Sequence, residues 1–310
     1  MDSSFFAAAI VSGTPLLFAI LGEILTEKSG ELNLGVEGMM LIGSVFGFAV
    51  GFSTGNPVFA LLGAMAAGAG ASFIFGFLTI TLKANQVVTG LTLTIFGTGF
   101  SSFMGKKYVG EIVPDNIKSF FANYPIPGLS KIPFIGEVLF NQGVFVYLGY
   151  IAAIATGIYL YKTRMGLNLR AVGENSGAAD ASGISVSLYK YSHVMAGGAL
   201  SGLAGAYLSL VYVPAWQENV TAGRGWIAVA LVIFCKWNPY NVLMGAFIFG
   251  GLDIIGFRLQ KFENLHISQY LIDMLPYLVT IFIIIITSVN KKKESMPPAS
   301  LGVPYFREDR

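Results

Sequence analysis

The sequence predicts an all-α integral membrane protein, a polytopic transmembrane helix bundle of about eight to nine membrane segments. Two observations support this prediction. Hydrophobic residues make up 54% of the 310 residues and charged residues 12%, whereas soluble domains carry about 25% charged residues. Long stretches without a charged side chain also recur along the chain. A soluble core of this size could not bury so much apolar surface, but lipid can solvate it.

The charge-free stretches define the expected segments, because a helix needs about 20 apolar residues to cross the hydrocarbon core. They are residues 5–22, 38–82 with an interruption at 55–57, 84–105, 143–161, 191–217, 225–235, 237–252 and 274–290. Counting 38–82 as two segments and starting the last near Ile267 gives nine. The stretch 225–235 is short, since eleven helical residues rise only about 16 Å. We expect it to be half of a broken helix or to continue past Lys236.

The first stretch, residues 5–22, is expected to be a retained span. A secretory leader has a basic region ahead of its apolar core and small residues at a cleavage site. Here Asp2 is the charged residue ahead of the stretch, and Glu23 and Glu27 follow it. This pattern is typical of a membrane helix.

Composition also disfavours several functional classes. The net charge of +2 gives no polybasic signal for nucleic acid. A single cysteine, Cys235, excludes an internal disulfide, and two histidines make a clustered metal site unexpected. The phosphate-binding pattern G-x-x-x-x-G-K-[S/T] does not occur. We therefore expect no cofactor and no ATPase site in this chain, so that an ATPase powering it would be another subunit.

Positive charges in short loops indicate the orientation. The loop 162–190 is rich in them, and the tail begins with three lysines at 291–293. The loop's basic residues are Lys162, Arg164, Arg170 and Lys190. Four segments separate this loop from the tail, and because four is an even number, both can lie in the cytoplasm. Counting the spans backwards from the loop then places residues 106–142 and the N-terminus outside. Lys106 and Lys107 disagree with this assignment.

Glycine is abundant, with 38 residues, and many lie within spans at four-residue spacing. Gly198, Gly202 and Ala206 form one such stripe. Small residues allow helix backbones to approach closely in lipid. We therefore expect this stripe to pack helices and not to bind a ligand.

A glycine-rich break between two spans carries four acidic residues, at positions 23, 27, 31 and 37. Non-helical backbone at a membrane boundary requires protein or water to satisfy it. We expect Glu23, Glu27 and Glu31 to form a solvated acidic turn. Asn33 and Glu37 lie nearer the following span, and we expect them to line or support a pore.

Residues 214–226 form a matching break in the second half, where Thr221 is a plausible N-cap. Broken helices at corresponding positions of two halves indicate a transport pathway. The first break follows an outside-to-inside span and the second an inside-to-outside span. Residues 5–105 and 191–290 are therefore expected to be inverted repeats of four segments, joined by the fifth span.

Polar residues also begin the fourth span, at Asn85, Gln86, Thr89 and Thr92. A polar stripe on a membrane helix faces protein or water. These side chains could line a pathway for a polar, uncharged solute or form hydrogen bonds between helices. Both interpretations remain open.

Two acidic residues in the later spans, Asp253 and Asp273, could couple transport to an ion. Each lies near the end of a span, which favours solvation at the interface. An ion-coupled secondary transporter is the alternative from a different class.

The loop 162–190 mixes small residues with Arg170, Glu174 and Asp180. A short helix of this composition could fit a groove of a partner domain. The alternative is a solvated connector.

Three stretches resemble one family. They are SGELNLGVEGMMLIG at 29–43, GLNLRAVGEN at 166–175 followed by AADASGI at 178–184, and GRGWIAVA at 223–230 followed by WNP at 237–239. They resemble permease subunits of bacterial ABC importers for nucleosides and simple sugars, which share a superfamily with branched-chain amino-acid and ribose permeases. The likeness covers most of residues 16–290.

This resemblance implies a transmembrane permease subunit for nucleosides, whose transport is driven by ATP that a separate ABC ATPase subunit hydrolyses. A second homologous permease, an extracytoplasmic substrate-binding lipoprotein and the lipid of the bacterial plasma (inner) membrane complete the expected partners. Simple-sugar or branched-chain amino-acid transport is the alternative. Residues 1–290 are expected to form one permease domain with a cytoplasmic coupling loop at 162–190, followed by a cytoplasmic tail at 291–310.

The resemblance also assigns residues. The later pore segment adds Arg224 to the expected translocation pathway, which then comprises Asn33, Glu37, Asn85, Gln86, Thr89, Thr92 and Arg224. The coupling loop is expected to contact the ATPase through Arg170, Gly173, Glu174, Asn175 and Asp180.

Overall fold

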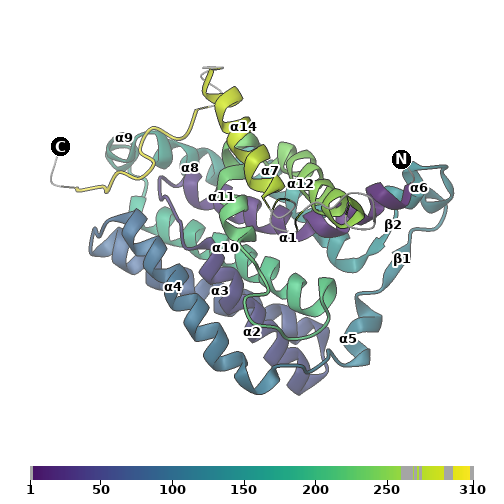
Figure 1. Ribbon diagram of the computed structural model, residues 1–310. Coiled ribbons are helices and arrows are strands. Elements are labelled where there is room, and N and C mark those ends of the chain that lie inside the picture. The colour runs from purple at the N-terminus through teal and green to yellow at the C-terminus, as the bar shows by residue number, and fades with distance from the viewer. Residues whose placement is uncertain (1–2, 260–267, 269–270, 272–273, 290–295, 308–310) are drawn as a thin grey trace.

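The computed structural model describes residues 3–259, 268, 271, 274–289 and 296–307, with the side chains of 283, 284 and 286–289 left aside. These residues form a helical bundle (Figure 1). Asp273 and the lysines at 291–293 lie outside the described residues, so the predictions made for them are not addressed.

The first half contains α1 (Ser3–Lys28), α2 (Val36–Thr54), α3 (Pro57–Gly76), which continues as a π-helical turn (Phe77–Thr81), and α4 (Gln86–Gly105). A connecting region follows, with α5 (Asp115–Phe120), α6 (Ile135–Leu139) and a small antiparallel pair of β1 (Asn123–Pro125) and β2 (Asn141–Gly143). Next come α7 (Val144–Lys162), α8 (Arg164–Glu174) and α9 (Ser176–Ala181). The second half contains α10 (Val186–Tyr207), extended by a π-helical turn (Leu208–Tyr212), α11 (Arg224–Phe234), α12 (Pro239–Leu259) and α14 (Leu275–Val289).

Among the described residues, seven helices are long and apolar enough to cross a membrane: α1, α2, α3, α4, α7, α10 and α12. The shorter α11 has 11 residues and α14 has 15. Together they confirm the expected eight to nine segments. Helix α11 does not continue past Lys236, because Lys236 and Trp237 adopt φ of 56° and 51° and turn the chain into α12.

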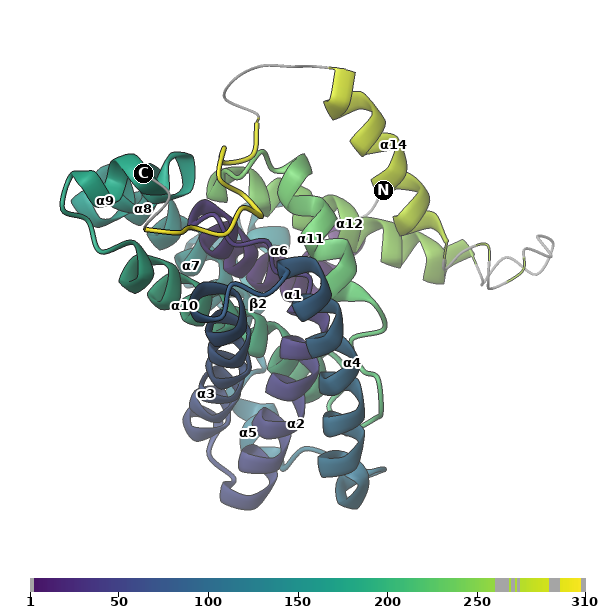
Figure 2. The same cartoon turned by 90° about the vertical axis from the view of Figure 1, so that its left-hand side faces the viewer.

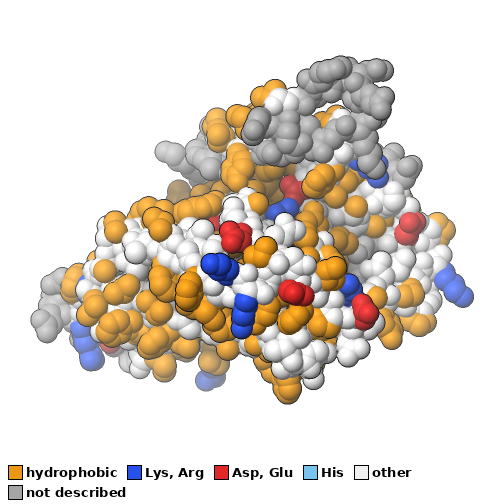
Figure 3. Space-filling model, turned by 60° about the horizontal axis from the view of Figure 1, so that its bottom comes forward, with side chains coloured by type: hydrophobic (Ala, Val, Ile, Leu, Met, Phe, Trp, Pro, Cys, Tyr) orange, Lys and Arg blue, Asp and Glu red, His pale blue; other side chains and the backbone are white. Residues whose placement is uncertain are grey.

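The spans differ in how deeply they are buried. Helix α1 is at the centre of the bundle, with 78% of the residues in its apolar 18-residue stretch buried. In the corresponding stretches of α3 and α4, 33% of the residues are buried. On the outer face of α4, Ile95 and Phe103 are 75% and 78% exposed. Hydrophobic side chains are spread over the face drawn in Figure 3, and charged side chains lie among them, several near its centre. An apolar outer surface is what lipid solvates.

Close helix packing confirms the interpretation of the small-residue stripe on α10. A Cβ atom added to Gly202 would collide with the carbonyl oxygen of Ala64 on α3, and one added to Gly43 would collide with Gly202 itself. A Cβ atom on Gly198 would collide with Ser72. Small residues at these positions let α2, α3 and α10 approach with backbones in contact.

Helix pairing follows the pattern expected of two related halves. Helix α3 packs on α10, and α12 packs on α1. In the same way α2 packs on α10, and α11 packs on α1. Exchanging the first four segments for the last four therefore relates these contacts between the halves, but α2 also packs closely on α3 whereas α11 makes little contact with α12. An inverted-repeat relation between 5–105 and 191–290 stays a prediction.

Opposite ends of the bundle collect different segments. At one end Ser3 donates a hydrogen bond to Glu137, and Ile112 forms a β-bridge with Ala215. At the other end Gly302 donates its amide to the carbonyl of Gly30 at 3.1 Å. Figure 2 shows the described tail passing beside α8 and α9, away from α5. The grouping agrees with the predicted topology, in which the N-terminus and residues 106–142 share one side.

Candidate functional site

The first break in the bundle separates α1 from α2 and is lined by buried carboxylates. Gly30 has φ of +90° and begins a non-helical passage that ends at Gly35. Glu23, Glu27 and Glu31 are exposed by 1%, 3% and 1%. The predicted solvated acidic turn is therefore wrong. The end of α1 lies inside the protein, where α8, α10 and the tail cover it, and hydropathy alone could not reveal that covering.

Each of these three acids is hydrogen-bonded to a different part of the chain. Glu23 accepts a bond from the amide of Asn33 at 3.2 Å, across the break. Glu27 accepts one from the indole Nε1 of Trp237, in the turn between α11 and α12. The carboxylates therefore fix the end of α1 to the break and to the second half.

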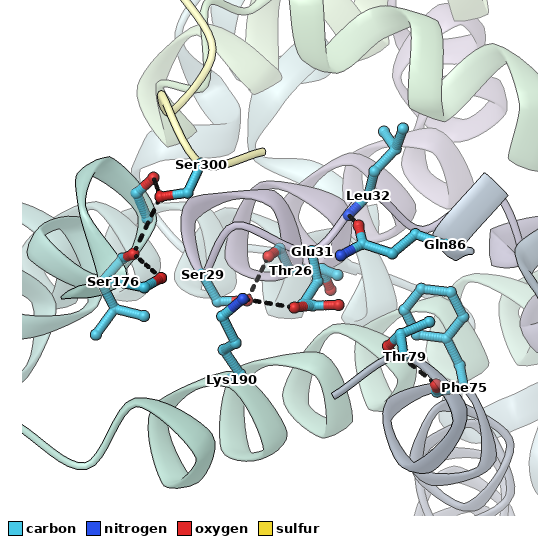
Figure 4. A network of polar contacts seen from close by, with 12 residues as sticks. Thr26, Ser29, Glu31, Leu32, Phe75, Thr79, Gln86, Ser176, Lys190 and Ser300 are labelled. Carbon is cyan, nitrogen blue, oxygen red and sulfur yellow. Dashed lines mark hydrogen bonds and ion pairs between the residues drawn. The ribbon is translucent and has the colours of Figure 1, made fainter. Parts of the chain in front are cut away.

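Glu31 forms a buried ion pair with Lys190 of α10, with Oε1 and Nζ 2.7 Å apart (Figure 4). The two side chains are 1% and 2% exposed. Lys190 was counted among the loop charges that set the orientation, but it lies inside the bundle as the partner of Glu31. Sequence patterns gave no signal for this pairing, because 159 residues separate the two.

Glu37, the second residue of α2, lies at the N-terminus of α11. Its carboxylate accepts hydrogen bonds from the Thr221 hydroxyl at 2.5 Å and from the amides of Gly223 and Gly225 at 2.9 and 2.6 Å. A carboxylate at a helix N-terminus satisfies free amides and interacts favourably with the helix dipole. The two breaks of the bundle are therefore joined at one side chain.

Thr221 does not cap α11 as predicted. The N-cap is Gly223, at φ of 84°, and the hydroxyl of Thr221 is directed to Glu37 instead. The prediction was wrong because the capping group for α11 comes from the other half of the molecule. A local sequence pattern cannot show a cap supplied from 186 residues away.

Arg224 and Asp253 form a second polar pair beside this junction, at 3.4 Å. Asp253 also accepts a hydrogen bond from Ser12 at 3.0 Å, and the Arg224 guanidinium lies over the ring of Tyr212. The Arg224 and Asp253 side chains are 17% and 21% exposed. Asp253 is therefore a paired acid within the protein, and not the solvated acid that its place near a span end suggested.

The predicted polar stripe of α4 divides between two directions. Gln86 is 4% exposed and accepts a hydrogen bond from the amide of Leu32 at 2.7 Å (Figure 4), and Thr89 is 8% exposed. Asn85 and Thr92 are exposed. Gln86 thus joins α4 to the first break by a hydrogen bond. This contact corresponds to the second of the two interpretations, in which these residues form hydrogen bonds within the protein.

Asn85 and Thr92 are each engaged in local hydrogen bonds. Asn85 caps α4 by accepting from the amide of Val88 at 3.0 Å, and the Thr92 hydroxyl donates to the Val88 carbonyl at 2.8 Å. A residue that the sequence patterns did not identify, Thr94, bonds the carbonyl of Leu34 at 3.0 Å.

Asn33 is buried and shapes the break. Its side-chain oxygen accepts from the amide of Gly35 at 2.9 Å. This short-range bond turns the chain into α2. Asn33, Gln86 and Thr89 therefore surround the first break, Glu37 and Arg224 lie at the second, and their contact with a solute stays a prediction.

The predicted coupling loop consists of α8 and α9, joined at an exposed corner formed by Glu174 and Asn175. Asn175 caps α9 by accepting from the amide of Ala178 at 2.9 Å. Gly173 is buried, and a Cβ atom there would collide with the carbonyl oxygen of Lys28 at the end of α1. The corner therefore rests directly on the first break.

The other predicted coupling residues lie to either side of this corner. The Arg170 guanidinium lies 5.4 Å from the centre of the Tyr161 ring. Asp180 accepts a hydrogen bond from Tyr305 at 2.9 Å and pairs with Arg307 at 3.3 Å. The role of the tail in this region was not predicted from the sequence.

A polytopic bundle with two broken helices that meet at a buried polar junction is typical of membrane transport proteins. The chain belongs to the family described as branched-chain amino acid transport system / permease component, which it matches over residues 5–284. It is therefore a multi-pass membrane permease, as the resemblance predicted.

Similar proteins extend this finding. The chain is 36% identical to TsgC13 of Haloferax volcanii, provisionally named a glucose ABC transporter permease protein, over 97% of each chain. It is 35% identical to the guanosine ABC transporter permease protein NupQ of Bacillus subtilis, covering 98% of this chain and 96% of NupQ. It is 32% identical to the nucleoside ABC transporter permease protein NupC of Lactococcus lactis, covering 97% and 96%.

Membership of this family implies an ATPase partner and a paired permease. In Bacillus subtilis a second guanosine ABC transporter permease protein, NupP, is 27% identical to this chain over 78% of its residues. Two guanosine ABC transporter permease proteins of Bacillus subtilis thus resemble the same chain.

Proposed function

We propose that this chain is the membrane-spanning permease subunit of an ATP-binding-cassette importer for nucleosides. One structural observation carries the proposal: the carboxylate of Glu37 joins the two helix breaks of a family permease. The solute class comes from the guanosine and nucleoside permeases to which the chain is similar. No bond of the solute is changed, and ATP is hydrolysed by a separate subunit.

In the proposed mechanism, two halves rock against one another around the joined breaks. Glu37 holds the N-terminus of α11, and Glu31 holds α10 to the first break. Helices α8 and α9 connect α7 to α10, so a force on their exposed corner would reach both of these helices. The proposed pathway residues are Asn33, Glu37, Asn85, Gln86, Thr89, Thr92 and Arg224. The proposed ATPase contacts are Arg170, Gly173, Glu174, Asn175 and Asp180.

The proposal includes an assembly and an orientation. Two ATPase subunits would dock on the cytoplasmic side, a second permease would complete the pathway, and a substrate-binding lipoprotein would deliver the solute outside a bacterial plasma membrane. Residues 1–290 would form the permease domain and 291–310 a cytoplasmic tail.

Single cysteines test this orientation in a Cys235→Ser background. Ser182 on the coupling side and Asn123 on the opposite side are both exposed. A thiol reagent that does not cross the membrane should label Asn123→Cys in intact cells and Ser182→Cys after permeabilisation. Labelling of Ser182→Cys in intact cells would reverse the topology.

A simple-sugar permease is the second candidate, because the 36% identical relative is named for glucose. Branched-chain amino acids are a further alternative, from the family description. An ion-coupled mechanism is less favoured, since Asp253 is paired with Arg224.

Uptake by cells that lack the gene decides among these solutes. Radiolabelled guanosine, glucose and leucine would be offered to the deletion strain with and without the restored gene. We expect restoration to raise guanosine uptake and leave glucose and leucine unchanged. Restoration of glucose or leucine uptake alone would contradict the nucleoside assignment.

A further inference from the structure

The C-terminal segment 296–307 crosses the coupling region and is held there by its backbone. The amide of Ser300 donates to the carbonyl of Gly173 at 2.9 Å, and its hydroxyl donates to the same oxygen at 2.7 Å (Figure 4). Two residues further on, the amide of Gly302 bonds Gly30. The segment therefore bridges the end of α8 and the first break.

Side chains fix the remainder of the segment. Pro298 is buried, and the Tyr305 ring packs with Val172 and Ala179 on the inner side of α8 and α9. The Tyr305 hydroxyl bonds Asp180. The Lys83 ammonium lies 5.8 Å from the centre of the Phe306 ring. The segment thus has a defined seat, which a freely solvated tail would not need.

Two hollows flank the seated segment. One, of about 280 Å³, is lined by Glu174, Asn175, Ser176, Gly177, Ala299, Ser300, Val303, Pro304 and Tyr305. The other, of about 660 Å³, is lined by Lys83, Asp180, Tyr305, Phe306, Arg307 and the turn 183–187. Tyr305 lines both, so the segment forms a wall that each hollow shares.

The outer surface of the segment offers both apolar and charged groups. Val303 and Phe306 are 55% and 46% exposed, and the Arg307 side chain is 76% exposed. Burial, together with the charge of Lys190, lowers the pKa of Lys83 at the edge of the larger hollow. Val303 and Phe306 are apolar side chains that a docked protein would cover, with the charge of Arg307 beside them.

We propose that residues 296–307 form one half of the surface on which the ATPase subunit docks, the other half being α8 and α9. This inference rests on the proposed function. The occupant is assigned by continuity: the smaller hollow joins the segment to Glu174 and Asn175, the exposed corner of the coupling helices. The segment also donates a hydrogen bond to Gly30 in the first break. Residues 296–307 would therefore lie directly between a docked ATPase and the first break.

The test measures how much ATPase subunit co-purifies with the tagged permease when the complete transporter is expressed in its host. Tyr305→Ala with Phe306→Ala removes the shared wall. Tyr124→Ala with Phe120→Ala is the matched control, because these aromatic residues are 67% and 40% exposed at the opposite end of the bundle. A truncation after residue 295 removes the whole segment.

We expect the Tyr305/Phe306 variant and the truncation to lower ATPase recovery by about tenfold or more, as loss of interface anchors does. The control should match the wild type. If the Tyr305/Phe306 variant recovers as much ATPase as the wild type, the docking role of the segment is wrong, although the transporter assignment stands. If the truncation fails to insert, the point variant decides alone. If the wild type recovers no ATPase, the proposed function and this inference both fail.

Discussion

The two helix breaks have corresponding positions in the two halves, but they are built differently. The first, at residues 29–35, is short and enclosed: Ser29, Glu31 and Asn33 are each exposed by 1% or less. The second, at residues 213–223, is longer and partly open, with Glu218 and Asn219 exposed. It begins at the end of the bundle where Ala215 pairs with Ile112, and it ends beside Glu37.

The anchoring of the two breaks differs as well. Side chains from α1, α4 and α10 hold the first break, through Glu23, Gln86 and Lys190. The inner end of the second break is held by Glu37, a residue of the first half. The comparison indicates that the first break is the fixed reference and the second is the segment positioned against it. Loss of first-break anchors should therefore affect stability more than loss of Glu37, because the Ile112–Ala215 pairing still holds the outer end of the second break.

Breaking the Glu31–Lys190 pair should have the largest effect. Lys190→Met leaves the Glu31 carboxylate buried without its counter-charge, which costs about 3–5 kcal/mol of stability. Combining Lys190→Met with Glu31→Met should recover most of that loss, because a buried ion pair and an apolar pair of similar volume differ little in stability. Thermal unfolding in detergent measures both effects.

The matched control for this pair is Lys118→Met, since Lys118 and Asp115 form an ion pair in which the side chains are 38% and 99% exposed. It should leave the unfolding temperature unchanged. Equal unfolding temperatures for Lys190→Met and the wild type would show that the first break does not depend on its ion pair.

Glu37→Gln should have a smaller effect that appears mainly in uptake. The amide oxygen of glutamine can still accept from Thr221 and Gly223, but its NH₂ group faces the amide of Gly225. Loss of one hydrogen bond to a charged group costs about 1.5–3 kcal/mol. We expect solute uptake to fall strongly and the unfolding temperature to fall less than in Lys190→Met.

Glu218→Gln is the control for Glu37→Gln, because Glu218 is exposed in the same break. It should transport as the wild type does. If Glu37→Gln transports normally while Glu218→Gln does not, the outer part of the second break and not the Glu37 junction governs transport.

Gln86→Leu should give the smallest change in stability. It removes the acceptor for the Leu32 amide, a neutral hydrogen bond worth about 0.5–1.5 kcal/mol. Asn85→Leu, which removes only the cap of α4, separates local helix stability from the contact with the break. If Asn85→Leu lowers uptake and Gln86→Leu does not, the outward face of α4 contacts solute and the break does not need Gln86.

The features that the sequence predicted well are those set by hydropathy and short-range pattern. The spans, the two breaks, the half-length α11 and the packing role of Gly202 all follow from charge-free length and small-residue spacing. The partners of Glu31 and Glu37 could not be predicted, because each lies more than 150 residues away. Glu27 and Glu31 at the first break were misinterpreted for the same reason, since their partners Trp237 and Lys190 are also distant in sequence. Hydropathy places a carboxylate at an interface unless its buried partner is known.

We propose that ATP hydrolysed by a separate subunit drives transport through this chain. The most direct measurement is nucleoside uptake into proteoliposomes that contain the purified transporter, with either ATP on the ATPase side or an imposed proton or sodium gradient and no ATP. Glu174→Lys, at the exposed corner of α8 and α9, is measured in parallel. We predict uptake with ATP alone, and its loss in Glu174→Lys together with loss of solute-stimulated hydrolysis. Uptake driven by an ion gradient without ATP would show that this chain belongs to an ion-coupled transporter and not to an ATP-driven one.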